Sequence, residues 1–326
     1  MNAVRLSKRQ FGLGVLALTA ACAALAYGLY RRDLNAARAR LAGASEIAAT
    51  RCGPTEYADV GTGAPLLVVH GAGGGFDQGL TIGAPLVARG HRVIAVSRFG
   101  YLRTPLPPDA SAAAQADAHA CLLDALGVER AAVVGASAGA PSALQLAVRH
   151  PERVSALVLM VPAAYAPRPG GEAAVRTPPG TLRLFATALR FDFVFWAIRR
   201  AAPTLMIRGV LGTPPELVER ADAAERARVG AMLDEILPVS DRRLGLVNDA
   251  IVTTTIARYA LEHVSAPTLT ISAADDLYGT YEAARYTAEQ IRGARFVGYA
   301  DGGHVLVGRD AEVTSEIAEF LATAGN

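Results

Sequence analysis

The pentapeptide Gly135-Ala136-Ser137-Ala138-Gly139 constrains the fold more than any other feature of this chain. Residues 131–134 before it are apolar and predict a buried strand, and residues 140–149 after it predict a helix. A serine with small residues two positions to either side fits the sharp strand-to-helix turn that presents a nucleophilic hydroxyl above a sheet. Small residues are needed there because the turn is strained and neighbouring strands press close to it. The pattern predicts Ser137 as a nucleophile at the end of a strand.

Apolar runs alternate with helical stretches over much of the chain. Short continuous apolar runs are typical of strands buried on both faces of a sheet. Strands that alternate with helices predict a doubly wound, mostly parallel α/β sheet. The predicted strands are residues 55–60, 65–69, 92–96, 131–134, 154–161, 267–271 and 295–299, and the predicted helices include residues 80–89, 111–126, 281–291 and 311–321.

The alternation stops near Pro162 and resumes at Pro267. The segment between them is rich in proline, arginine and helical patterns, which predicts a helical cap inserted between core strands 6 and 7. An aromatic cluster at residues 185–196 either lines an apolar pocket or packs the cap onto the core. The predicted division is a basic N-terminus (1–10), a transmembrane anchor (11–30), a linker that begins as a short polar helix (31–54), a first part of the core (55–165), the helical cap (166–263) and a second part of the core (264–326).

Residues 11–30 form a charge-free run of 20 residues rich in leucine, alanine and valine. A helix of this length spans about 30 Å, the thickness of a bilayer core. Cleavable signals usually have a shorter apolar stretch of about 7–15 residues, so the length favours an uncleaved anchor. Two alternatives stay open, a twin-arginine-like export signal at residues 7–11 and a lipoprotein-like cleavage site before Cys22. Basic residues flank the run on both sides and favour only slightly a catalytic domain outside the cytoplasm.

The composition and charge of the chain limit the kinds of partner that it is expected to bind. The chain has 326 residues and a formal net charge of +2, and its basic residues are scattered, whereas a nucleic-acid interface needs a clustered basic stripe. Its three cysteines are widely spaced and match no metal-binding pattern. Their spacing allows a Cys52–Cys121 disulfide, but structural burial of the two thiols is the favoured interpretation. We expect no metal, no cofactor and no nucleic-acid partner.

A serine nucleophile needs a base within hydrogen-bonding distance, and six histidines compete for this role. In this architecture the base follows the nucleophile and the acid along the chain, which excludes the histidines before Ser137. His150 closes the helix after the nucleophile, and His263 lies before the seventh strand. His304 follows Gly302-Gly303 in a loop after the last predicted strand. We therefore predict His304 as the base.

The acid that orients His304 is expected after a strand that precedes it. Asp275 and Asp276 both follow the strand ending at Ile271. Asp276 is preferred because its position leaves room for the strand and the turn, and Asp275 then serves as a turn or capping residue. Asp301 is a weaker candidate because it is too close to His304 to lie on a separate loop.

A glycine-rich loop, His70-Gly71-Ala72-Gly73-Gly74-Gly75, follows the predicted strand at residues 65–69. Such a loop lets backbone N–H groups converge on a carbonyl oxygen as it becomes an oxyanion. The N–H groups of Ala72 and Ala138 are the predicted pair. A phosphate-binding loop is disfavoured because the chain lacks the required glycine spacing. His70 itself is expected to brace the loop.

Taken together, these motifs resemble the α/β-hydrolase fold family, and in particular membrane-anchored bacterial members with a cap insertion. The resemblance covers residues 55–321 and implies a serine hydrolase that cleaves a carboxylester, thioester or lactone through Ser137, His304 and Asp276. Its substrate is expected to be a small molecule with an apolar acyl or aryl group. An acyltransferase, a C–C bond hydrolase or a weakly catalytic membrane-tethered binding protein are the alternatives. The resemblance also rests on residues 98–101 and 150–154, whereas Ser97 and Ala273 depart from the family pattern.

Overall fold

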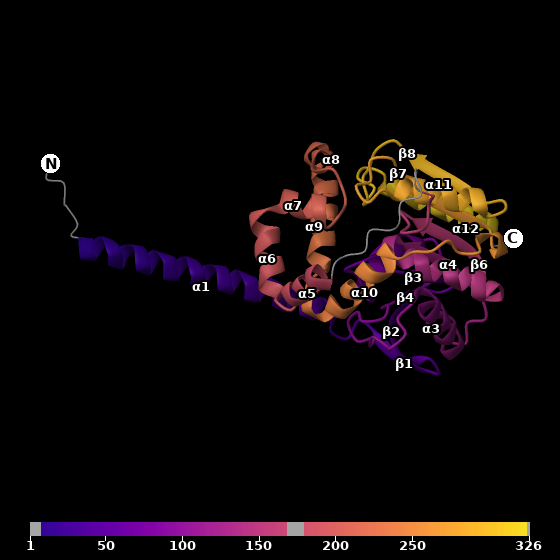
Figure 1. Ribbon diagram of the computed structural model, residues 1–326, viewed down its shortest axis with the longest axis horizontal. Helices are drawn as coiled ribbons and strands as arrows, with labels where there is room; N and C mark the ends of the chain where they lie inside the picture. Colours follow the sequence, from indigo (N-terminus) through magenta and orange to yellow (C-terminus); the bar gives the residue numbers. More distant parts are fainter. Residues whose placement is uncertain (1–7, 168–178, 325–326) are drawn as a thin grey trace.

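The computed structural model describes residues 8–167 and 179–324. Eight strands form one sheet in the order β1-β2-β4-β3-β5-β6-β7-β8 (Figure 1). β1 and β2 pair antiparallel, as do β2 and β4, and all later pairs are parallel. This confirms the predicted doubly wound, mostly parallel sheet. The strands are β1 (Glu46–Thr50), β2 (Gly53–Val60), β3 (Ala64–Val69), β4 (His91–Val96), β5 (Ala131–Ala136), β6 (Val154–Met160), β7 (Thr268–Ala273) and β8 (Arg295–Tyr299).

Helices cover both faces of the sheet because alternate side chains of each strand point to opposite faces. Leu67 and Val69 of β3 pack with residues of α3 and α4, whereas Leu66 and Val68 pack with residues of α2 and α12. All four side chains are fully buried, as the continuous apolar runs predict. The core helices are α2 (Phe76–Val87), α3 (Ala112–Ala125), α4 (Ala140–Arg149), α11 (Thr280–Gln290) and α12 (Asp310–Ala324).

Helices lie between β6 and β7, where the sequence predicts the cap. They share an apolar cluster of their own, which includes Met206, Val229 and Leu233. Residues 168–178 of the predicted cap lie outside the described residues. The cap helices are α5 (Pro179–Ala188), α6 (Asp192–Ala201), α7 (Pro203–Gly209), α8 (Pro215–Arg220), α9 (Ala223–Glu235) and α10 (Arg243–Thr254), with short 3₁₀ helices η4 (Ser240–Arg242) and η5 (Leu261–His263).

The N-terminal helix α1 (Lys8–Leu41) is longer than the predicted anchor and projects from the globular part (Figure 1). Residues Gly12–Leu41 are long and apolar enough to cross a membrane, a property that signal sequences share. The C-terminal part of α1 packs against the globular part of the protein, where Leu34 and Ala37 are buried. Ala37 packs with Trp196 and Leu237 of the cap.

The helix predicted at the start of residues 31–54 is present as the end of α1, which continues to Leu41, but the remainder is not a linker because β1 occupies Glu46–Thr50. The core therefore begins at β1 and not at Thr55. β1 is a short edge strand with mostly exposed side chains, so it lacks the apolar run that identifies the inner strands. Its position depends on antiparallel pairing with β2 across the turn at residues 51–52.

The favoured interpretation of Cys52 and Cys121 as separate buried thiols is also wrong. The two residues form a disulfide across a Cα–Cα distance of 6.0 Å. Cys52 lies in the turn between β1 and β2, and Cys121 lies in α3. The bond links the edge of the sheet to a helix that covers one face. The two cysteines are 69 positions apart, so no local pattern in the sequence predicts that they meet.

Candidate active site

Ser137 lies at the turn between β5 and the 3₁₀ helix η1 (Ser137–Gly139), directly before α4. Its φ of 48° is in the left-handed region, which non-glycine residues rarely adopt and which often marks functional sites. The positions of the two glycines that flank Ser137 leave no room for a side chain. A Cβ on Gly135 would lie 2.7 Å from the Cβ of Ala143, and one on Gly139 would lie 2.5 Å from the carbonyl oxygen of Val69. The turn therefore has the strained geometry that the pentapeptide predicts.

The structure brings Ser137, His304 and Asp276 together in one hydrogen-bonded chain. His304 Nε2 lies 2.8 Å from Ser137 Oγ, and His304 Nδ1 lies 2.8 Å from Asp276 Oδ2. An ionised carboxylate only accepts hydrogen bonds, so Nδ1 carries the proton and Nε2 is left as an acceptor for the serine hydroxyl. This arrangement is able to remove a proton from Ser137.

Asp276 is held in place by its own loop. The backbone N–H of Tyr278 donates to Asp276 Oδ1 over 2.8 Å, and the hydroxyl of Thr280 donates to Oδ2. Asp275 contacts the backbone of the loop that carries the imidazole. Its Oδ1 accepts the backbone N–H of Gly303, the residue before His304, over 2.8 Å. Asp276 thus orients the imidazole ring, while Asp275 holds the loop that carries it.

The glycine-rich loop runs alongside Ser137. A Cβ on Gly71 would lie 3.2 Å from the Cβ of Ser137, so the loop backbone approaches the serine closely. Ala72 and Ala138 line the same cavity as Ser137. Ala138 belongs to the first turn of η1, whose N–H groups have no acceptor inside the helix. These positions suit the predicted pair of oxyanion donors.

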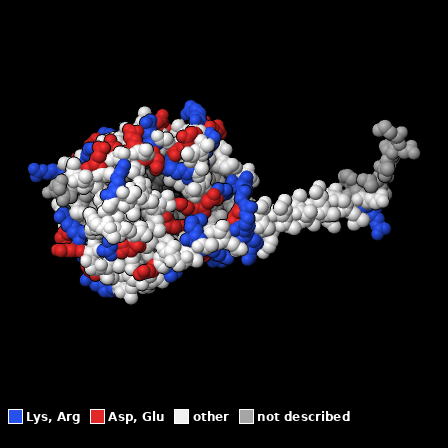
Figure 2. All heavy atoms as spheres, turned by 180° about the vertical axis from the view of Figure 1, so that it is seen from behind, with Lys and Arg blue, Asp and Glu red and all other residues white. Residues whose placement is uncertain are grey.

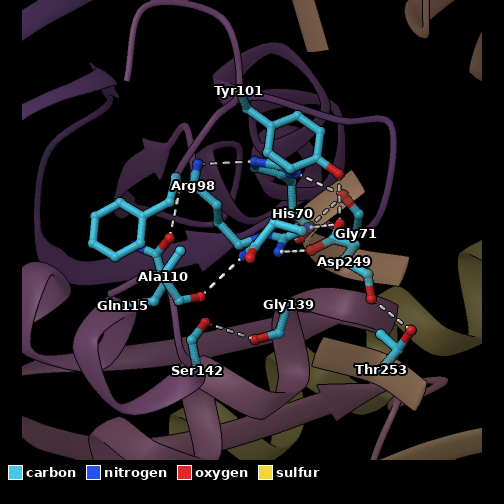
Figure 3. A network of polar contacts seen from close by, with 12 residues as sticks. His70, Gly71, Arg98, Tyr101, Ala110, Gln115, Gly139, Ser142, Asp249 and Thr253 are labelled. Carbon is cyan, nitrogen blue, oxygen red and sulfur yellow. Dashed lines mark hydrogen bonds and ion pairs between the residues drawn. The ribbon is translucent and has the colours of Figure 1, made fainter. Parts of the chain in front are cut away.

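A buried polar network holds His70 and Gly71, the first two residues of the glycine-rich loop (Figure 3). Arg98 donates to the carbonyl oxygens of His70 and Gly71 over 2.9 and 3.1 Å, and it forms a two-pronged ion pair with Asp249 at 2.6 and 2.7 Å. The Tyr101 hydroxyl donates to Asp249 over 2.5 Å. Burial and the nearby Arg98 hold the pKa of His70 well below its ordinary value, so His70 is neutral and serves as a brace. Asp249 comes from cap helix α10, so the cap supports the loop.

A second cap residue reaches the same loop. Arg242, which is fully buried, donates to the carbonyl oxygen of Gly74 over 2.5 Å and pairs with Asp77 of α2 at 2.7 Å. Breaking a buried ion pair by removing one partner costs about 3–5 kcal/mol because the other charge stays buried. Cap and core are therefore joined by buried ion pairs that contact the glycine-rich loop near its beginning and near its end.

The loops that carry Asp276 and His304 also meet the cap at one point. The carbonyl oxygen of Gly212 accepts the backbone N–H groups of Leu277 over 2.9 Å and of His304 over 3.3 Å. Gly212 has a φ of +53°, and a Cβ there would lie 2.5 Å from the ring of Tyr278. That ring packs edge-on against His304 with centroids 4.8 Å apart. The segment that follows α7 thus contacts the loop of Asp276 and the loop of His304.

Ser137 opens into a cavity of about 1380 Å³. Its lining is mostly apolar, with Met160, Val161, Leu246 and Ile236 among the residues that enclose it. Glu235 also lines the cavity, and burial raises the pKa of its carboxyl group. This volume exceeds the roughly 300–1,000 Å³ of common ligand pockets. The site therefore has room for a long or branched apolar group.

The aromatic cluster of the cap is divided between two roles. Phe185 and Phe195 line the cavity. Phe193 and Trp196 instead pack against Tyr30 of α1, with ring centroids 5.3 and 5.7 Å apart. Part of the cluster therefore faces the cavity, and the rest joins the cap to the N-terminal helix, a contact that neither sequence interpretation included.

Two of the other histidines, His119 and His150, have local partners. His150 Nε2 lies 2.7 Å from Asp117 near the surface, and the buried His119 lies 3.2 Å from the hydroxyl of Ser142. Burial lowers the pKa of His119 to about 3. In residues 8–167 and 179–324, no three histidine, cysteine or acidic side chains are grouped so that they could hold a metal ion.

Sequence reasoning missed Asp249, Arg242, Gly212 and Thr280. Arg98 and Tyr101 were noted only as part of a loop motif, and their partner on α10 carries no local signal. Gly212 is one of 32 glycines, and nothing in its neighbours marks it. Thr280 is the exception, because it lies only four residues after Asp276 and a hydroxyl this close in sequence can be predicted to bond the carboxylate.

Comparison with known proteins places this geometry in a family. The family model described as alpha/beta hydrolase fold matches residues 64–309, so the chain belongs to the α/β-hydrolase fold family. An α/β-hydrolase fold protein from Nakamurella multipartita is 30% identical, with a TM-score of 0.67 over 86% of this chain and 100% of that one. The enol-lactonase from Burkholderia xenovorans LB400 has the same fold, with a TM-score of 0.64, 23% identity, and coverage of 85% of this chain and 100% of that one.

Among curated proteins, the 2-hydroxymuconate semialdehyde hydrolase of Pseudomonas sp. (strain CF600) is 41% identical over 110 residues. The match covers 32% of this chain and 39% of that protein. The chain thus matches well under half of the length of this relative. The protein is an α/β hydrolase.

Proposed function

We propose that this protein is a serine hydrolase that cleaves an ester-like bond, in a carboxylester, a thioester or a lactone. The observation that carries the proposal is the position of His304, with Nε2 2.8 Å from Ser137 Oγ and Nδ1 2.8 Å from Asp276 Oδ2. The strained φ of Ser137 supports it, because such strain persists only where the surrounding structure enforces it.

The reaction follows from these positions. Ser137 Oγ attacks the carbonyl carbon while His304 Nε2 takes the hydroxyl proton, and Asp276 stabilises the resulting imidazolium. The carbonyl oxygen becomes an oxyanion that accepts N–H bonds from Ala72 and Ala138. The bond to the leaving group then breaks, and His304 returns its proton to the departing oxygen or sulfur. A water molecule, deprotonated by His304, releases the acyl group and restores Ser137.

The charges of the cavity favour an uncharged acyl group. Several relatives have names that specify dienoate substrates, which carry a carboxylate. A carboxylate bound here would need a cationic partner. Arg228 lines the cavity, but it is paired with Glu225 at 2.6 Å and donates to the carbonyl oxygen of Val305. Arg98 is engaged by Asp249. Acyl transfer and C–C bond hydrolysis by the same triad, or ligand binding with little turnover, remain the alternative functions.

The acyl preference tests this proposal. We expect kcat/KM on soluble p-nitrophenyl esters to rise with acyl length and to exceed kcat/KM on dienoate substrates. Phe185→Ala should lower kcat/KM for the longest esters about tenfold and leave the shortest nearly unchanged, since a lost apolar contact is worth about 1–3 kcal/mol. Steady-state kinetics across an ester series measures both effects.

Phe191→Ala is the matched control, because Phe191 is exposed and lies outside the cavity lining. Its ester profile should match that of the wild type. Faster turnover of a dienoate than of any ester would replace ester hydrolysis by C–C bond hydrolysis. An acyl-enzyme that forms but does not turn over would favour the binding protein.

We further propose that the apolar half of α1 anchors the protein in a membrane, with the catalytic domain outside the cytoplasm. Large apolar side chains of this half, among them Leu13, Leu16 and Leu25, are exposed, and the apolar helix is long enough to span a bilayer. The Cys52–Cys121 disulfide supports this location, because disulfides persist mainly in oxidising compartments.

Two truncations distinguish the role of the N-terminal half of α1 from that of its C-terminal half. A variant lacking residues 1–25 should lose its membrane-spanning segment and retain kcat on a soluble ester, because Tyr30 and Asp33 keep their contacts with the cap. Removing residues 1–41 should lower the melting temperature, since it also deletes the buried Leu34 and Ala37. Membrane fractionation and thermal denaturation measure these outcomes. Intact mass spectrometry showing a mature N-terminus near Cys22 would contradict the anchor.

A further inference from the structure

Large exposed apolar side chains are concentrated on three consecutive cap helices, α5, α6 and α7, and on the residues that cap α6 and α7. Soluble proteins rarely expose large contiguous apolar areas, and such areas mark sites for partners or membranes. The most exposed are Leu184 at 72%, Leu205 at 61% and Phe191 at 57%. We refer to the set as the cap apolar surface, which consists of Leu184, Phe185, Phe191, Phe193, Val194, Ile198, Leu205 and Val210.

Contacts between α1 and α6 place the cap apolar surface beside the end of the apolar run at residues 11–30. Tyr30 is the last residue of the charge-free run, and its ring lies edge-on to Phe193 with centroids 5.3 Å apart. Asp33, three residues further along, accepts the indole N–H of Trp196 over 2.9 Å and pairs with Arg200. Helix α6 is therefore attached to α1 at the point where the apolar run ends. In a bilayer that point is the boundary between acyl chains and headgroups.

Basic side chains surround the same point. Figure 2 shows Lys and Arg atoms gathered where α1 leaves the globular part. Arg31 and Arg32 follow Tyr30 directly, and Arg199 and Arg200 end α6. Asp33 pairs with Arg32 and Arg200, and Asp234 pairs with Arg199, so these four arginines and two carboxylates carry a net charge of +2. Arginines beside an apolar surface are typical of protein segments that lie in the headgroup region, where they attract anionic lipids.

We propose that the cap apolar surface docks onto the lipid bilayer that α1 enters, with its arginines among anionic headgroups. This inference rests on the anchoring proposed above. The surface continues from the apolar half of α1 through the Tyr30–Phe193 contact, so one lipid phase covers both. A lipid surface fits better than a protein groove because both apolar side chains and arginines border the emerging helix.

Docking of the cap brings the cavity to the membrane. Phe185 and Val210 are 40% and 37% exposed, and both also line the cavity that contains Ser137. The cavity therefore reaches the surface among the residues that contact lipid. An apolar ester dissolved in the bilayer enters from the cap apolar surface and places its acyl chain in the cavity without crossing water. The substrate class is thus a membrane-dissolved acyl ester.

Spin labels on the full-length protein test the docking directly. Leu205→Cys places a label on the cap apolar surface, and Ile47→Cys places one on β1, which Figure 1 shows away from α7. Both carry Cys22→Ser, and the other two cysteines are joined in the disulfide. Leu205 and Ile47 are 61% and 48% exposed, so they are matched in type and exposure. The proteins are placed in vesicles of phosphatidylcholine and phosphatidylglycerol.

The label at residue 205 should collide more often with oxygen, which concentrates in lipid, than with a water-soluble nickel chelate. The label at residue 47 should show the opposite order. Equal behaviour of the two labels would overturn the proposal. Protection of residue 205 from both reagents would overturn it in favour of a second copy or a protein partner, and dilution of the protein in lipid would distinguish those two.

An activity measurement separates this inference from the proposed reaction. The double variant Phe191→Ser, Leu205→Ser should lose at least about fivefold in the rate on a long-chain ester dispersed in vesicles. Its kcat/KM on a soluble short ester should stay unchanged, since neither residue lines the cavity. An equal loss on both substrates would contradict the docking. Lipid contact at residue 205 without hydrolysis of any ester would contradict the proposed reaction and leave the docking intact.

Discussion

Replacement of Ser137 by alanine is expected to lower kcat on esters by several decades, about 10⁴ to 10⁶, with little change in the melting temperature. The substitution removes one hydroxyl and thus the atom that attacks the carbonyl. Alanine adopts the φ of 48° at about the same cost as serine, so the backbone strain of the turn is unchanged. Ester hydrolysis and thermal denaturation of the two proteins measure the result.

A fluorophosphonate probe should label the wild type and not the Ser137→Ala variant. Ser142 offers a matched control, since it is buried on the same segment and bonds His119 and the carbonyl oxygen of Gly139. Ser142→Ala should keep both labelling and turnover. Labelling that persists in the Ser137→Ala variant would assign the nucleophile to another serine and contradict the proposed site.

The parts of the fold that the sequence predicts are those with local signals. The inner strands are short apolar runs because both faces are buried, and the pentapeptide marks the turn at Ser137 by its need for small residues. The predicted order of nucleophile, acid and base matches the spatial cluster of Ser137, Asp276 and His304. Fixed chain order and fixed strand order made this cluster predictable without coordinates.

The parts that the sequence does not predict depend on contacts between distant segments. β1 is recognised only by its pairing with β2, and the disulfide only by the approach of the turn at Cys52 to α3. Trp196 and Asp33 are 163 positions apart, and no pattern in either segment indicates their hydrogen bond. The same holds for Arg98 and Asp249, which are 151 positions apart. The sequence therefore does not predict that the cap supports the site.

These contacts give the cap a second function besides enclosing the cavity. Asp249 and Arg242 fix the glycine-rich loop, and Gly212 contacts the loops of the acid and the base. Each of the proposed catalytic groups outside the β5–α4 turn is thus positioned partly by a residue of the cap. Because α1 is attached to α6, the chain of contacts extends from the N-terminal helix to the triad.

Asp276→Asn is expected to lower kcat by about 10⁴, whereas Asp275→Asn should change it by less than about tenfold. An asparagine at position 276 offers an amide N–H₂ as well as an oxygen, so the imidazole is no longer held with its proton on Nδ1. At position 275 the amide oxygen still accepts the N–H of Gly303, which preserves the contact that holds the loop. Asp275→Ala removes that acceptor and should reduce kcat more than Asp275→Asn does. Steady-state kinetics of the three variants decides the assignment, because a larger loss in Asp275→Asn than in Asp276→Asn would transfer the orienting role to Asp275.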